Sequence, residues 1–172
     1  MFVDEIKLSV HSGSGGSGSV SFKKTSTKSS PSGGSGGQGG SVIITVNDEF
    51  NDLSHIISNS SLKAENGTDG NKNFQNGKKG KDLIIEVPKG TKISIDNEVY
   101  ADLHENESSF TVLQGSKAGR GNYDLISKRV PNPQFCEHGE KRNKIEIKLT
   151  YSIYSDLVIV GLPNAGKSTL IT

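Results

Sequence analysis

The feature of this sequence that most restricts its fold is a spacing of three residues between glycines. Gly33, Gly36 and Gly39 follow it, and several other sets repeat it: Gly34/Gly37/Gly40, Gly13/Gly16, Gly15/Gly18, Gly67/Gly70, Gly77/Gly80 and, with one alanine, Gly115/Ala118/Gly121. Three residues is the period of a polyproline-II helix, which has no internal hydrogen bonds. Glycine at every third position leaves one face of such a helix bare. We therefore predict that these segments pack side by side as ordered extended rods.

A flexible Gly/Ser linker is the alternative interpretation, above all for residues 33–40. However, the three glycine-rich regions, residues 7–47, 63–81 and 114–130, share an excess of lysine and arginine over acids and are flanked by strand patterns. A tether has no reason to keep a register of three in all of these regions, so packing is the preferred interpretation.

Alternation of apolar and polar residues predicts about eight short, half-buried strands. The alternating positions are Ile6/Leu8/Val10, Val20/Phe22, Val42/Ile44/Val46, Leu83/Ile85/Val87, Ile93/Ile95, Val99/Ala101/Leu103, Phe110/Val112 and Ile145/Ile147/Leu149/Tyr151. This number of strands indicates a closed barrel or a sandwich. Only 31% of the residues are hydrophobic, so the core should be modest. The one helical signal, residues 50–57 after Asn47, predicts a turn or two at most.

A phosphate-binding consensus, G-x-x-x-x-G-K-[ST], is satisfied near the end of the sequence, directly after the apolar run 156–160 that is typical of a buried parallel strand. Backbone N–H groups of such a loop bind phosphate oxygens, Lys167 would face the β and γ phosphates, and Ser168 would bind Mg²⁺. The predicted nucleotide-binding residues are Gly161, Leu162, Pro163, Asn164, Ala165, Gly166, Lys167 and Ser168.

Four residues follow Ser168, so no catalytic site is complete within these 172 residues. A nucleoside triphosphatase also needs a second Mg²⁺ ligand, a γ-phosphate sensor and residues that recognise the base. We therefore expect the 172-residue chain alone to hydrolyse no nucleotide and to bind GTP negligibly.

Several blocks of the sequence together resemble the Obg family of GTP-binding proteins. They are Gly-Gly-Ser-Gly-Gly-Gln-Gly-Gly-Ser-Val at 33–42, Lys-Ala-Glu-Asn-Gly at 63–67, Leu-Ile-Ile-Glu-Val-Pro-Lys-Gly-Thr at 83–91, Ala-Gly-Arg-Gly-Asn at 118–122 and Gly-Leu-Pro-Asn-Ala-Gly-Lys-Ser-Thr at 161–169. The resemblance implies a mainly β, glycine-rich N-terminal domain over residues 1–154, with polyproline-II-type segments packed on a small eight-stranded β-barrel. Residues 155–172 would be the first strand and phosphate loop of a truncated α/β G domain.

The resemblance also implies a function: binding of GTP and GDP with Mg²⁺, slow GTP hydrolysis, and association with the large ribosomal subunit during its assembly. The glycine-rich domain would face the ribosome, and the candidate RNA contacts are Lys23, Lys24, Lys28, Lys72, Lys78, Lys79, Lys81, Arg120, Lys128 and Arg129. A solvated surface is the alternative for each basic cluster. A non-catalytic ribosome-binding or scaffold module, and an ATP-using protein with an unrelated glycine-rich extension, remain alternative functions.

The N-terminus has no basic and apolar regions typical of a signal peptide, and no apolar run approaches the roughly 20 residues that span a bilayer. We therefore expect a cytoplasmic protein without a membrane partner, and a monomer. Cys136 is the single cysteine, which excludes an intrachain disulfide, and the four histidines lack metal-ligand spacing.

Overall fold

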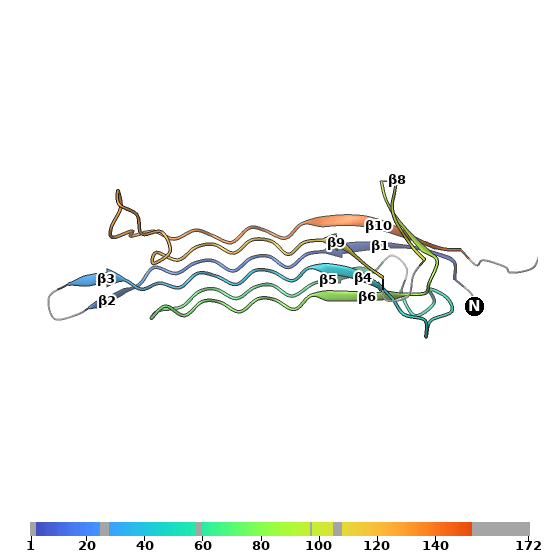
Figure 1. The fold of residues 1–172 in the computed structure, drawn as a ribbon, viewed down its shortest axis with the longest axis horizontal. Coiled ribbons are helices and arrows are strands. Elements are labelled where there is room, and N and C mark those ends of the chain that lie inside the picture. Colours follow the sequence, from blue (N-terminus) through green and yellow to red (C-terminus); the bar gives the residue numbers. More distant parts are fainter. Residues whose placement is uncertain (1–2, 25–27, 58–59, 97, 105–107, 153–172) are drawn as a thin grey trace, which may run out of the picture.

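The computed structural model describes residues 3–24, 28–57, 60–96, 98–104 and 108–152. Figure 1 shows most of the strands gathered at one end of a long rod, with one short pair of strands at the other end. No helix occurs in these ranges, so they contain none that could cross a membrane. The strands are β1 (Glu5–His11), β2 (Phe22–Lys24), β3 (Ser29–Pro31), β4 (Val42–Val46), β5 (Ser61–Lys63), β6 (Leu83–Val87), β7 (Thr91–Ile95), β8 (Glu98–Leu103), β9 (Ser109–Leu113) and β10 (Lys144–Tyr151).

The strands form three sheets. The largest has the order β5-β1-β10-β7-β8, the second has the order β6-β4-β9, and β2 pairs with β3 alone. In the largest sheet, β1 runs antiparallel to β10, with Leu8 opposite Ile147, and parallel to β5. In the second sheet, β4 runs parallel to β6 and antiparallel to β9. The two larger sheets thus contain strands that are far apart in the sequence.

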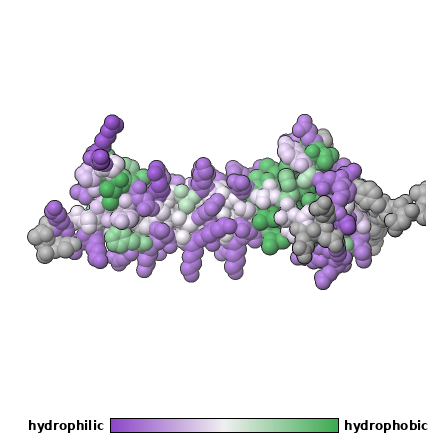
Figure 2. Space-filling view, viewed as in Figure 1, coloured by the Kyte–Doolittle hydropathy of each residue, from purple (hydrophilic) through white to green (hydrophobic). Residues whose placement is uncertain are grey.

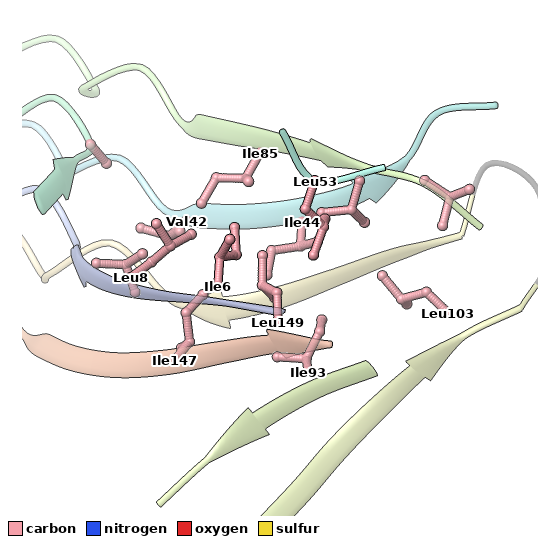
Figure 3. Close-up of a cluster of buried hydrophobic side chains, with 14 residues drawn as sticks. Ile6, Leu8, Val42, Ile44, Leu53, Ile85, Ile93, Leu103, Ile147 and Leu149 are labelled. Carbon is pink, nitrogen blue, oxygen red and sulfur yellow. The ribbon is translucent and has the colours of Figure 1, made fainter. Parts of the chain in front are cut away.

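One hydrophobic core lies between the two larger sheets, and Figure 3 shows their side chains pointing toward one another. The alternation of apolar and polar residues explains this arrangement, since successive side chains of a strand lie on opposite faces. Leu53, from the turns after β4, completes the core with 0% exposure. The buried set is Ile6, Leu8, Val10, Val42, Ile44, Val46, Leu53, Ala64, Ile85, Val87, Ile93, Leu103, Ile147 and Leu149.

The structure departs from the predicted strands in three places. The described ladders leave β5 and β6 as sheet edges, so the strands form two facing sheets rather than a closed eight-stranded barrel. An apolar hollow of about 480 Å³ lies at this edge, lined by residues of both strands and by residues 55–57. Val20 and Phe22, predicted to be half-buried, are 41% exposed, and Val99 on β8 is 63% exposed. The expectation for residues 50–57 is confirmed, because they form turns and bends.

Six extended segments run side by side from the sheets to the distal end of the molecule, and we call them the rod (Figure 1). Their hydrogen bonds recur at every third residue: the N–H groups of Gly13, Gly16 and Ser19 donate to the carbonyls of Gly40, Gly37 and Gly34 at 2.8–3.0 Å. This repeat confirms the predicted packing and is incompatible with a flexible tether. The segments are residues 12–21, 32–41, 64–71, 75–82, 114–122 and 137–143.

The glycines of the rod are needed for space. A Cβ atom on Gly16 would lie 2.0 Å from the carbonyl oxygen of Thr68, and one on Gly36 would lie 2.0 Å from that of Gly16. Among the described glycines only Gly90, in the turn between β6 and β7, has a positive φ, of 87°. The rod glycines are therefore not required for an unusual backbone conformation. They allow the neighbouring backbone to approach.

Side chains accept hydrogen bonds from backbone N–H groups that do not take part in the repeating main-chain hydrogen bonds. Asn66 and Asp69 accept hydrogen bonds from the N–H groups of Ser14 and Ser17 at 3.0 and 2.7 Å. Asn122 is fully buried and joins several segments: its Oδ1 accepts from Gly33 N–H at 2.8 Å, and its Nδ2 donates to the carbonyls of Ser21 and Pro133. Because buried polar groups need partners, these side chains complete the hydrogen bonding of the rod.

Candidate nucleic-acid interface

The distal end of the rod combines β2, β3, the turn at residues 71–75 and the connection 123–135 (Figure 1). Six of the predicted RNA contacts lie on these elements or directly beside them, and all six are exposed: Lys23, Lys24, Lys28, Lys72, Lys128 and Arg129. Three regions that are separate in the sequence thus bring their cations to one end of the molecule.

Exposed apolar side chains gather at the same end, and Figure 2 shows a hydrophobic patch there on an otherwise hydrophilic rod. Phe74 and Tyr123 meet edge to face, with ring centroids 4.8 Å apart, and each is nearly half exposed. Aromatic faces stack on unpaired bases, and cations bind phosphates, so this mixture suits single-stranded nucleic acid. The exposed apolar set is Val20, Phe22, Phe74, Tyr123, Ile126, Val130 and Phe135.

The backbone that holds Phe74 is unusual. Asn73 and Phe74 have φ angles of 57° and 61°, in the left-handed region, which bulky residues rarely occupy. A hydrogen bond from Phe74 N–H to the Ser32 carbonyl, at 2.8 Å, fixes the turn to the neighbouring segment. The structure therefore holds an aromatic ring in solvent at a cost in backbone energy, a feature that clusters at functional sites.

The other four predicted contacts, Lys78, Lys79, Lys81 and Arg120, lie along the side of the rod and are exposed. Two of them have partners within the chain. Lys79 Nζ lies 3.0 Å from Asp82 Oδ2. Arg120 donates from Nε and Nη2 to the two carboxylate oxygens of Glu137, at 2.9 and 2.7 Å.

The Arg120–Glu137 pair joins two neighbouring segments of the rod. The side-chain hydrogen bonds from Arg120, with a further bond from its backbone N–H, lower the pKa of Glu137 to about 2. The same contact raises the pKa of Arg120. The guanidinium group of Arg120 is therefore already bound, and its role as an RNA contact stays a prediction.

Carboxylates on the rod turn toward its own backbone. Glu65 Oε2 accepts from Lys81 N–H at 3.1 Å, Asp82 Oδ1 from Ser41 N–H at 2.6 Å, and Glu140 Oε2 from Lys117 N–H at 3.1 Å. Lys78 and Lys81, in contrast, are exposed and form no ion pair in the described part of the chain. This division of roles leaves cations as the groups that the rod presents to a partner.

The predicted nucleotide-binding residues, Gly161 to Ser168, lie outside the described residues. Their arrangement, and the Mg²⁺ ligand role of Ser168, stay predictions. Within the ranges that the structure describes, no group of three or more His, Cys, Asp and Glu side chains is arranged to hold a metal ion.

Sequence reasoning missed the aromatic part of the distal end. A signal was present in the sequence: Phe74 stands alone in the polar run Asn-Lys-Asn-Phe-Gln-Asn-Gly at 71–77. An aromatic residue in a polar turn has no core to enter. Its pairing with Tyr123, by contrast, depends on two parts of the chain that are distant in sequence.

Comparison with known proteins gives a consistent family. A sequence profile described as GTP1/OBG matches residues 3–153. The chain is 42% identical over its whole length to a protein of Nautilia profundicola named GTPase Obg, of which it covers 49%. It is also 41% identical to GTPase Obg of Finegoldia magna, covering 42% of that protein, and 36% identical to GTPase Obg of Brachyspira hyodysenteriae, covering 26%.

The chain thus spans half or less of the length of these curated relatives, and the part that the family profile matches contains both the facing sheets and the glycine-rich rod. Its sequence and the family profile agree over nearly all of the described residues. This chain belongs to the GTP1/OBG family.

Proposed function

We propose that this chain is the RNA-facing part of a GTPase that acts in the assembly of the large ribosomal subunit. Residues 1–154 would form the ribosome-binding domain, and residues 155–172 would begin a G domain that binds GTP or GDP with Mg²⁺ and hydrolyses GTP slowly. Membership of the GTP1/OBG family and relatives named GTPase Obg support the nucleotide part of the proposal.

The observation that carries the ribosomal part is the distal end of the rod. Exposed cations from three separate regions of the sequence lie there together with exposed aromatic rings, and Phe74 is held in solvent by a left-handed backbone. The rod has the rigidity that a probe of a folded RNA needs, since hydrogen bonds tie each segment to its neighbours at every third residue. Such a surface would bind RNA phosphates through lysine and unpaired bases through stacking.

A filter-binding assay with purified large ribosomal subunits tests this proposal. The variant Lys23→Gln/Lys24→Gln removes two charges from β2, and the control Lys7→Gln/Lys89→Gln removes two exposed charges from the sheet end. We expect the distal variant to bind about tenfold more weakly, and its plot of log affinity against log salt to be shallower by about 1.5, because two phosphate contacts are lost. Equal behaviour of the two variants would remove the distal end from the proposal.

The variant Phe74→Ala separates stacking from charge. Alanine leaves all cations in place, so affinity should fall by roughly 1–3 kcal/mol while the salt dependence stays that of the wild type. An unchanged affinity would show that the ring is not part of the interface.

For the nucleotide part, we propose that Lys167 and Ser168 bind phosphate and Mg²⁺ only when the rest of a G domain is present. A phosphate loop relies on the strand before it and on the N-terminus of the helix after it. Calorimetry of the 172-residue polypeptide should therefore detect no GTP binding in the sub-millimolar range. Sub-millimolar affinity for GTP would contradict this, and a preference for ATP would favour the alternative ATP-using class.

A further inference from the structure

A second group of cations lies where the rod joins the five-stranded sheet, far from the distal end. With about 3.1 Å of rise per residue in an extended segment of this type, residues 12–21 place the two ends of the rod roughly 30 Å apart. The junction is formed by the last residues of β1 and β5 and by the first residue of β10. None of its residues is among the cations of the distal end.

Three side chains form a row across neighbouring strands at this junction. In the sheet register, His11 on β1 lies directly opposite Lys63 on β5 and Lys144 on β10. Leu8 and Val10 point into the core, so His11, one residue beyond Val10, lies on the outer face of the sheet, and its two cross-strand partners share that face. Because β1 lies between β5 and β10, the backbones of Lys63 and Lys144 are about 10 Å apart, two strand spacings. Their long side chains can both reach over His11.

Beneath these side chains, β1 carries buried polar atoms that have no hydrogen-bond partner. Nδ1 of His11 and Oγ of Ser9, two residues earlier on the same face, are buried and make no hydrogen bond within the described part of the chain. Buried polar atoms of a folded protein normally have a partner, and an unpaired one needs an explanation. A ligand that accepts hydrogen bonds would provide one.

The electrostatics of the row favour an anion. Burial lowers the pKa of His11, and the charges of Lys63, Lys144 and Arg142 lower it further. The one described ion pair in the group is between Lys144 Nζ and Glu146 Oε1, 3.6 Å apart and well exposed on both sides. Exposed pairs of this kind contribute little. The charged groups that shift the pKa of His11 are thus all cations.

We propose that Lys63, Lys144 and Arg142, above His11 and Ser9, form a second RNA-binding site that holds a backbone phosphate at the base of the rod. The site deepens the proposed ribosomal function and rests on it. It gives the rod two attachment points, one at each end, so that a bound RNA fixes its direction as well as its position. The phosphate would take its charge complement from the three cations.

The first test is binding to purified large ribosomal subunits with the variant Lys63→Gln/Lys144→Gln. Both lysines are exposed, so the variant should fold normally. The control is again Lys7→Gln/Lys89→Gln, which removes the same charge but none of the cations that shift the pKa of His11. We expect the junction variant to bind at least fivefold more weakly than the control, with a salt dependence shallower by about 0.8, because one phosphate contact is lost. Equal affinities and slopes for the junction variant and the control would overturn the site.

The second test follows the imidazole of His11 by NMR in the wild-type chain, with a short uridine homopolymer as the probe. A phosphate bound among the cations would offset the charges that disfavour the imidazolium, so the pKa of His11 should rise on addition of RNA. In Lys63→Gln/Lys144→Gln it should be raised already and respond little. The same rise with inorganic phosphate alone, at equal phosphate concentration, would mean a free-anion site and contradict the assignment to RNA.

The two tests fail separately. If the wild-type chain binds no large subunits while the homopolymer still raises the pKa of His11, the ribosomal function is wrong and the site stands. If the distal variant weakens subunit binding while the junction variant matches the control and His11 does not respond, the function stands and the site is wrong.

Discussion

Glycine positions in the rod have no room for a β-carbon, because a carbonyl oxygen of the next segment occupies its place. On Gly16 that oxygen belongs to Thr68, and on Gly37 it belongs to Lys78, each 2.0 Å from an ideal Cβ. The obstacle is backbone rather than a flexible side chain, so it moves only if the whole segment moves. Ser17, next to Gly16, is half-buried and holds its neighbour through its backbone N–H.

The substitution Gly16→Ala should therefore destabilise the protein by about 3 kcal/mol or more, at the upper end of the range for overpacking a core. Ser17→Ala, its matched control, should change the free energy of unfolding by less than about 0.5 kcal/mol, as do substitutions away from special features. Urea denaturation of both variants measures this difference. A near-native midpoint for Gly16→Ala would mean that the segments are not packed as described.

At the scale of elements, an ion pair links two neighbouring segments of the rod. Arg120 on segment 114–122 and Glu137 at the start of segment 137–143 form a two-point contact at the distal half of the rod. Because both side chains are exposed, the contact is screened by solvent and salt, and its value lies in aligning the two segments. Because the pKa of Glu137 is lower in the folded protein than in an unfolded chain, the contribution of this contact to stability depends on pH.

Glu137 should stay ionised in the folded protein down to a pH of about 2, whereas in an unfolded chain it takes up its proton near pH 4.5. The folded pKa is the lower one, so the contribution to stability is full above pH 4.5 and is lost as the pH falls from 4.5 toward 2. NMR titration of the Glu137 carboxyl carbon measures the folded pKa. In Arg120→Met it should return toward the usual range, and a pKa unchanged by that substitution would show that the guanidinium is not its cause.

The whole molecule has two parts with different sources of order. The sheets enclose a conventional core of aliphatic side chains, and the rod has almost none, so its order comes from backbone hydrogen bonds and close packing between segments. The two parts are continuous, since β1, β4 and β10 lead directly into or out of rod segments. The rod segments are therefore anchored at the sheets by continuous chain and ordered along their length by hydrogen bonds to their neighbours.

Relaxation measurements on backbone ¹⁵N should give rod residues 13–24 and 28–40 order parameters near those of the sheets, about 0.85. The reason is that their N–H groups are bound to neighbouring segments or to side chains such as Asn66 and Asp69. Free motion of residues 13–40 on the nanosecond timescale would contradict both the structure and the role of the rod as a rigid probe.

Some features were determined by the sequence itself, because they depend on a local period. The alternation at Ile6, Leu8 and Val10 specified an inward face of β1, and the triplet spacing of glycines specified extended segments with a bare face. The basic residues of three glycine-rich regions could likewise be identified as candidate contacts from the sequence. The phosphate loop was identified by its consensus, and its geometry stays a prediction.

Other features were decided only by tertiary structure, because they depend on which distant segments become neighbours. Two such contacts are the row of Lys63, His11 and Lys144 and the contact of Phe74 with Tyr123. The sheet orders that leave β5 and β6 as edges likewise depend on strands that are distant in sequence. A periodic pattern predicts which face of a segment is buried. It does not predict which segment packs against that face, because the packing partner depends on the summed hydrogen bonds and packing of the entire chain.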